Sequence, residues 1–128
     1  MVLLQCVNAY MAVQALMERE TDYQTAYALV CLKKELSGPV EFYQREERRL
    51  MEEFAARDEE GKVIWNEGGR FRLRDPEAAQ LYRGKRAELD MVEIKQKIIP
   101  VRVSRPDRIK PAVLEALDGF LIFEEDAL

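Results

Sequence analysis

The stretch LVCLKKELSGPVEFYQREERRLMEEF, residues 29–54, decides how this chain folds. Its apolar residues recur at intervals of three, four and seven, and they are Leu29, Leu32, Leu36, Val40, Tyr43, Leu50 and Phe54. A strand cannot place these positions on one face, because its side chains alternate with a period of two. Charged residues fill the positions between them and form a solvated opposite face. The stretch therefore predicts a long amphipathic helix.

The pair Gly38-Pro39 interrupts this pattern. Proline has no amide hydrogen to donate, and its ring clashes with the preceding helical turn, so we expect the helix to kink or to stop here. Pro39 could equally be the first residue of a separate helix that Ser37 caps. The sequence leaves both alternatives open.

A first helix is predicted from Leu3 to about Met17, where apolar residues again recur at helical spacing. Thr21 or Asp22 is expected to cap the second helix, which should run to about Ala56. Because the link between the two helices is short, we expect them to fold back as an antiparallel pair.

The region after this pair predicts a β-hairpin and a third helix. Two short apolar segments, 63–65 and 71–73, flank the Gly-rich tetrapeptide 66–69, a pattern typical of a hairpin. Asp75-Pro76-Glu77 then supplies a capping residue and a proline at the first helical position.

The last third of the chain predicts short strands around one short helix. Residues 92–103 are rich in β-branched residues, and 120–123 form a second strand candidate. Pro111 is expected to open a helix over 112–117 that Gly119 stops.

Length and composition favour a single domain. The chain has 128 residues, of which 48% are hydrophobic and 34% charged, values typical of a globular protein. No repeat or low-complexity linker is evident. We expect residues 1–128 to form one α+β domain, with the helical pair over 1–57 and the hairpin, third helix and strands over 58–128.

The charge and hydropathy pattern excludes several classes of protein. A net charge of −4 gives no broad field that would attract nucleic acid or anionic lipid. No apolar run approaches the ~20 residues that a membrane helix needs, and the opening residues lack the basic segment of a signal peptide. A cytoplasmic location without membrane contact is therefore expected.

The sequence contains no histidine, which removes the commonest general base and metal ligand and every Ser-His or Cys-His nucleophile. Cys6 and Cys31 lie in apolar runs with no neighbouring Cys or His, and we interpret them as buried apolar residues. We therefore predict no catalytic, cofactor-binding or metal-ligating residue, and a protein that is not an enzyme.

A carboxylate–metal enzyme is the weakest alternative. It would use the acidic cluster near the end of the long helix, which comprises Glu46, Glu47, Glu52, Glu53, Asp58, Glu59 and Glu60. Basic residues lie at helical contact spacing from these side chains, however, and ion pairs on a solvated surface account for them.

Three arginines form a candidate contact for phosphates, nucleic acid or an acidic partner. Arg70, Arg72 and Arg74 alternate with apolar residues, so on a strand they would share one face. The segment Lys95–Lys97 could extend such a site. The alternative is that the outer face of a hairpin is simply polar, and the negative net charge favours that interpretation.

The apolar face of the long helix is larger than the shorter first helix can cover. We expect its far end, with Tyr43, Leu50 and Phe54, to form a candidate interface. Trp65, the only tryptophan, is expected to pack in the core or the hairpin, and it could instead anchor the same interface. A homo-oligomer, most simply a two-fold dimer, would cover these residues. The hairpin around Trp65 and the C-terminal strand could also cover them within one chain.

The order of these segments carries a resemblance. The motifs concerned are Tyr27-Ala28-Leu29, Glu35-Leu36, Glu41-Phe42-Tyr43, Glu59-Glu60-Gly61, Asp75-Pro76-Glu77, Val92-Glu93-Ile94, Pro111-Ala112-Val113-Leu114 and Phe120-Leu121-Ile122. Together they resemble a family of small uncharacterised proteins encoded by phages and prophages of Gram-positive bacteria. That family has no assigned catalytic residues, so the resemblance implies a phage or prophage origin and leaves the activity open.

The expected function is therefore non-catalytic. The protein would bind itself or another phage or host protein in the host cytoplasm, with incorporation in a virion left open. A nucleic-acid-binding regulator that uses Arg70, Arg72 and Arg74 is the first alternative, and nucleic acid is not the expected partner.

Overall fold

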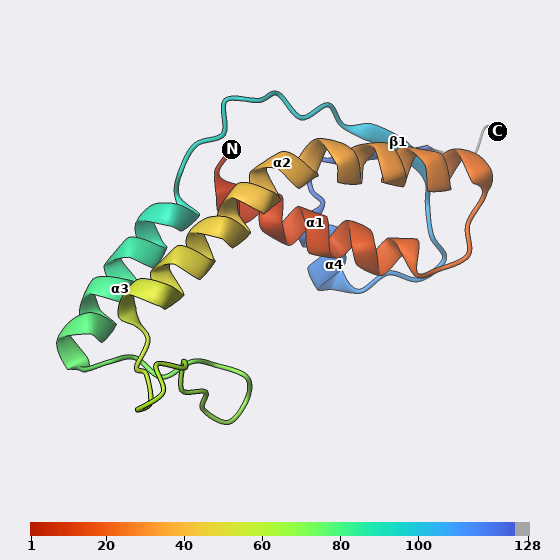
Figure 1. Cartoon of the computed structure of the whole chain (residues 1–128). Helices are drawn as coiled ribbons and strands as arrows, with labels where there is room; N and C mark the ends of the chain where they lie inside the picture. Colours follow the sequence, from red (N-terminus) through yellow and green to blue (C-terminus); the bar gives the residue numbers. More distant parts are fainter. Residues whose placement is uncertain (125–128) are drawn as a thin grey trace.

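The computed structural model describes residues 1–124, which form four helices and two short strands (Figure 1). In chain order they are α1 (Leu3–Met17), α2 (Tyr23–Phe54), α3 (Pro76–Asp90), β1 (Val101–Ser104), α4 (Pro111–Ala116) and β2 (Leu121–Glu124). The expected mixture of helix and strand is confirmed. Residues 125–128, the end of the predicted domain, lie outside the described part. Among the described helices, none has the length and apolar composition needed to cross a bilayer.

Helices α1 and α2 pack against each other and run in opposite directions (Figure 1). The side chain of Asp22 accepts a hydrogen bond from the amide of Thr25 at 2.8 Å, so Asp22, rather than Thr21, caps α2. Helix α2 ends at Phe54, two residues before the predicted end at Ala56.

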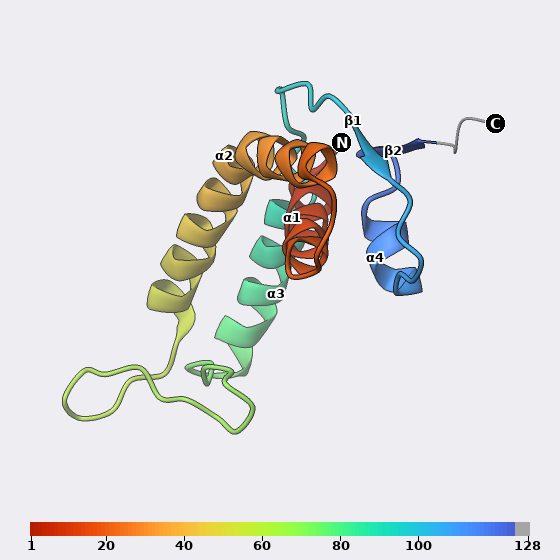
Figure 2. The ribbon, with the colours of Figure 1, turned by 90° about the vertical axis from the view of Figure 1, so that its right-hand side faces the viewer.

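Helix α2 is continuous through Gly38-Pro39 and bends there instead of splitting in two (Figure 2). The hydroxyl of Ser37 donates to the carbonyl of Lys34 at 2.7 Å and caps no new helix. Pro39 cannot bond the carbonyl of the preceding turn, which removes one rung of the helix and permits the bend. Of the two alternatives, a kinked helix and a separate helix that begins at Pro39, the structure has the kinked helix.

The bend divides the apolar stripe of α2 between two cores. The first core joins the N-terminal half of α2 to α1, α4 and the sheet, and its buried residues are Cys6, Ala9, Ala12, Val13, Leu29, Leu32, Leu36, Val103, Leu117 and Phe120. The second core joins the C-terminal half of α2 to α3 and to the first residue of α1, and its buried residues are Leu3, Tyr43, Leu50, Phe54, Ala78 and Leu89. Helices α1 and α2 thus both contribute to both cores.

The second core corrects the expected position of the interface. Tyr43 and Phe54 are each only 3% exposed, and Leu50 is 9% exposed, because all three pack with α3. Helix α3, together with Leu73 of the predicted hairpin, covers the far end of α2, and neither a second copy nor the C-terminal strand is needed. These three side chains are unavailable to a partner, and Trp65 alone of the four predicted residues is exposed.

The two cysteines differ in burial. Cys6 lies in the first core, where burial raises the pKa of its thiol, in agreement with its interpretation as a buried apolar residue. Cys31 on α2 is half-buried, so that interpretation holds only in part.

Strands β1 and β2 form a two-stranded parallel sheet in which Val101 pairs with Leu121. Helix α4 lies between the strands in sequence, as a parallel connection requires, and Gly119 follows it with a φ of 84°. Earlier in the predicted strand region, Glu93 forms only an isolated antiparallel bridge with Val2. Of the one or two strands predicted over 92–103, β1 occupies only the last three positions, 101–103, and extends to Ser104.

Candidate partner-binding surface

Residues 55–74, between α2 and α3, form three short antiparallel pairings, and we call this segment the hairpin platform. Its bridges join Ala55 with Leu73, Arg57 with Val63, and Trp65 with Phe71. Three backbone hydrogen bonds link the segments in a closed cycle. The amide of Ala56 donates to the carbonyl of Arg72 at 2.7 Å, the amide of Arg72 to the carbonyl of Ile64 at 2.8 Å, and the amide of Ile64 to the carbonyl of Ala56 at 3.0 Å. Residues 63–65 and 71–73 form no strands, so of the predicted hairpin the structure has the single bridge between Trp65 and Phe71. Residues 55–57, which follow α2, supply the additional segment.

The three residues that these hydrogen bonds link are eight positions apart in the sequence, a repeat that the sequence interpretation missed. The two turns of the platform, Asp58-Glu59-Glu60-Gly61-Lys62 and Asn66-Glu67-Gly68-Gly69-Arg70, share the order Asp or Asn, Glu, any residue, Gly, and a basic residue. Gly61 and Gly69 both take the left-handed conformation, with φ values of 82° and 77°, and close their turns there. This short repeat is the signal that could have revealed the platform.

A row of aromatic rings leads from the second core to Trp65 in the platform. Ring centroids lie 6.3 Å apart for Phe54 and Tyr82, 5.3 Å for Tyr82 and Phe71, and 6.4 Å for Phe71 and Trp65, all edge to face. Trp65 ends the row and is 57% exposed. The platform itself lies at the end of the molecule away from the sheet (Figure 1). Trp65 is therefore held on one side and open to solvent on the other.

The three predicted arginines have separate environments. Arg74 donates to the carbonyl of Glu53 in the last turn of α2 at 2.8 Å, where a helix leaves carbonyls without partners. Arg72 donates through Nε to the side chain of Asn66 at 3.3 Å. Arg70 is exposed. Arg74 thus serves the end of α2, and the anion contact stays a prediction that rests on Arg70 and Arg72.

Lys95 and Lys97 do not join these arginines. Their segment forms no strand and runs along α2 near its bend, away from the hairpin platform (Figure 1). The amide of Ile99 donates to the carboxylate of Glu35 at 3.3 Å and holds the segment there.

A polar cluster fastens α2 to α3 beside the second core. The hydroxyl of Tyr43 donates to Asp90 at 2.6 Å and accepts from Arg86 at 2.9 Å, and Arg86 also contacts Glu47 at 2.6 Å. Burial and the hydrogen bond to Asp90 raise the pKa of Tyr43 to about 12. Each of these groups has its partner within the chain, so the cluster acts as a clasp between the helices.

The predicted acidic cluster is spread over separate contacts. Glu46 forms an ion pair with Arg49 at 3.2 Å, and Glu47 forms one with Arg86 of α3 at 2.6 Å. The carboxylate of Asp58 accepts the amides of Glu60 and Lys62, each at 2.9 Å, inside its own turn. Within residues 1–124, no three Asp, Glu, Cys or His side chains come together in a way that could hold a metal ion.

No protein-family model matches the chain, and no curated protein or solved structure matches it either.

Proposed function

We propose that this chain is a non-catalytic binding protein of phage or prophage origin, and that another protein docks on Trp65 at the end of the hairpin platform. The exposure of Trp65, 57%, is the observation that carries the proposal. Buried tryptophans supply a large share of the binding energy at protein interfaces. An indole that lies in water beside a row of aromatic rings gains free energy when a partner covers it.

The backbone hydrogen bonds of the platform support the same proposal. Three closed pairings and two glycine turns fix the position of Trp65 before any partner arrives. A surface that is already ordered loses less conformational entropy on binding. Arg70 and Arg72, which alternate with Phe71 on the same segment, add residues that are frequent at interfaces.

The phage or prophage origin rests on the resemblance in the order of segments. A nucleic-acid-binding regulator has less support, because Arg74 is engaged by a helix carbonyl and Lys95 and Lys97 lie elsewhere. The net charge of −4 also opposes long-range attraction of nucleic acid.

Capture of partners by the tagged full-length chain from infected or induced cells tests the proposal. We expect the wild type to retain a specific protein, and Trp65→Ala to reduce its recovery at least about tenfold, the loss typical of an interface anchor. Leu81→Ala is the matched control, because Leu81 is an equally open apolar residue, 51% exposed, on α3.

Equal recovery with wild type and Trp65→Ala, at unchanged circular dichroism, would contradict the proposal. Titration with DNA at two salt concentrations provides the second comparison. Binding that weakens steeply with salt would favour the regulator instead, since phosphate contacts release counterions.

A further inference from the structure

The two-stranded sheet has one covered edge and one open edge. The strands are parallel, and Val101 donates its amide to the carbonyl of Phe120 at 3.0 Å, so residues 101 and 103 direct their backbone groups toward β2. Residues 102 and 104 direct theirs the other way, where the amide of Ser104 donates to the hydroxyl of Thr25 on α2 at 2.9 Å. Helix α2 therefore covers the outer edge of β1.

The outer edge of β2 has no such cover. The same alternation directs the backbone groups of Leu121 and Phe123 away from β1. The amide of Leu121 donates to the carbonyl of Leu117 at 3.3 Å. Within residues 1–124, the carbonyl of Leu121 and both backbone groups of Phe123 have no hydrogen-bond partner, and β1 is the only strand that pairs with β2 (Figure 2). Three successive backbone groups of an extended segment are thus open to a partner.

A hollow of about 490 Å³ lies between α4 and this edge. Its apolar lining comprises Pro111, Leu114, Leu117, Leu121 and Phe123. A strand that pairs with β2 directs every second side chain to the same face as Leu121 and Phe123, and therefore into this hollow. The backbone groups and the hollow thus fit the same occupant, an extended segment with an apolar residue at every second position.

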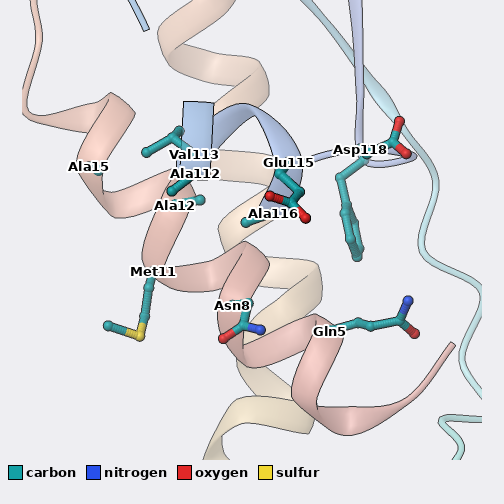
Figure 3. Close-up of a pocket in the computed structure, with 11 residues that line it drawn as sticks. Gln5, Asn8, Met11, Ala12, Ala15, Ala112, Val113, Glu115, Ala116 and Asp118 are labelled. Carbon is teal, nitrogen blue, oxygen red and sulfur yellow. The ribbon is translucent and has the colours of Figure 1, made fainter. Parts of the chain in front are cut away.

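The charged groups that line the hollow are acidic. They are Glu115 and Asp118, and Figure 3 shows both carboxylates at the C-terminal end of α4. Arg105 lies over the ring of Phe123, at 5.7 Å from its centroid, but does not line the hollow. Two copies joined through β2 would bring their acidic groups together, so charge opposes a second copy and attracts a segment that carries Lys or Arg.

We propose that the open edge of β2 binds an extended segment of another protein as an antiparallel third strand, with apolar side chains at alternate positions and Lys or Arg at its ends. Antiparallel pairing lets Phe123 exchange two hydrogen bonds with a single residue of the segment. A sheet of only two strands is marginally stable, and a third strand adds to its stability. In strand addition, main-chain hydrogen bonds supply affinity, and pockets for alternate side chains supply specificity.

This edge is separate from the surface in the proposed function. The hairpin platform with Trp65 lies at the end of the molecule away from the sheet (Figure 1). Loss of partner capture at Trp65 and loss of strand binding at β2 can therefore be observed independently.

A nine-residue peptide in which valine and threonine alternate, with lysine at both ends, tests the proposal by fluorescence anisotropy with the full-length chain. We expect saturable binding and slower hydrogen exchange of the Phe123 amide in the complex. N-methylation of the valine amides should weaken binding at least about tenfold, because residues that face the hollow direct their amides to β2 in an antiparallel pair. N-methylation of the threonine amides, which face away from β2, should change the affinity less than about twofold.

Charge reversal tests the preference for basic ends. Glu115→Lys combined with Asp118→Lys should weaken binding of the lysine peptide about five- to tenfold and strengthen binding of a peptide with glutamate at both ends. Both side chains are exposed, so the core stays intact. Glu59→Lys combined with Glu67→Lys is the matched control, because it makes the same change of charge at exposed positions on the hairpin platform and should leave the affinity unchanged.

Absence of saturable binding by the lysine peptide would overturn the proposal, and so would equal binding of the unmodified and both methylated peptides. Loss on methylation of the threonine amides alone would overturn the antiparallel pairing. A Phe123 amide that is already protected in the free protein, together with a dimer mass in light scattering, would assign the edge to a second copy instead.

Discussion

At the scale of residues, Tyr43 combines the apolar and polar contacts that join α2 to α3. Its ring lies in the second core, with the guanidinium of Arg86 at 5.4 Å from the ring centroid. Its hydroxyl donates to Asp90 and accepts from Arg86. Because both partners are charged, these hydrogen bonds are stronger than those between neutral groups.

The substitution Tyr43→Phe keeps the ring and removes the hydroxyl. We expect it to lower the free energy of unfolding by about 1–2 kcal/mol at neutral pH, the range for a partly exposed hydrogen bond to a charged group. Urea unfolding measures the difference. Tyr23→Phe is the control and should have no effect, because Tyr23 is 96% exposed.

This effect should depend on pH in a defined direction. The pKa of Tyr43 is raised from 10.0 to about 12 in the folded chain, so the native state keeps a proton that the unfolded state releases. The stabilisation is therefore fully present below pH 10.0 and is lost as the pH rises through about 12. In a titration of tyrosinate absorbance, Tyr43→Phe should remove the step near 12. Removal of a step near 10.0 instead would contradict the assignment.

Residue spacing predicts that Tyr43, Leu50 and Phe54 face an apolar partner, and the structure agrees. It does not identify that partner, because helix periodicity carries no information about which distant segment packs there. Leu89 and Ala78 of α3 fill this role from well beyond the end of α2. The predicted interface was wrong at these three residues for that reason.

At the scale of elements, α2 shows which structural features can be predicted from local sequence patterns and which cannot. Its start at the Asp22 cap and its approximate end follow from capping and spacing. Whether Gly38-Pro39 bends or splits the helix depends on tertiary packing, because either outcome loses the same backbone hydrogen bond. The two cores on either side hold both halves helical.

The hairpin platform was predicted only in part. Glycine turns and apolar segments identify the pairing of Trp65 with Phe71. The pairing of Ala55 with Leu73 joins the end of a helix to the approach to the next helix, and no turn signal links them. The similar sequences of the two glycine turns are the only sequence feature that indicates this pairing.

A pair of glycine substitutions tests the backbone of the platform. Gly61→Ala should destabilise the fold by about 1–2 kcal/mol, since an L side chain is strained at its φ of 82°. Gly84→Ala should instead stabilise it by about 0.5–1 kcal/mol, because Gly84 lies within α3 and an added Cβ has nothing within 4 Å. Denaturant midpoints measure both, and shifts of the same sign would contradict the assigned conformations.

At the scale of the whole molecule, two cores share the bent helix α2 and the helix α1 and leave two different surfaces open. The platform presents Trp65 at one end, and the outer edge of β2 presents open backbone groups beside its hollow. Sequence reasoning named Trp65 as a possible anchor but favoured its packing in the core or the hairpin, and the exposed indole shows that it is not a core residue. The β2 edge went unnoticed, although residues 120–123 were predicted as a strand, because a strand pattern does not show which strand lies at the edge of a sheet.

The fluorescence of Trp65 tests the central claim, that this residue anchors a binding surface, most directly. It is the only tryptophan in the chain, so its emission reports on the platform alone. We expect the free protein to emit as a water-exposed indole that acrylamide quenches readily. Addition of the protein captured by the wild type, chosen or mutated to lack tryptophan, should shift the emission to shorter wavelength and protect it from quenching. A Trp65 that stays equally open to acrylamide at saturating partner would contradict the account.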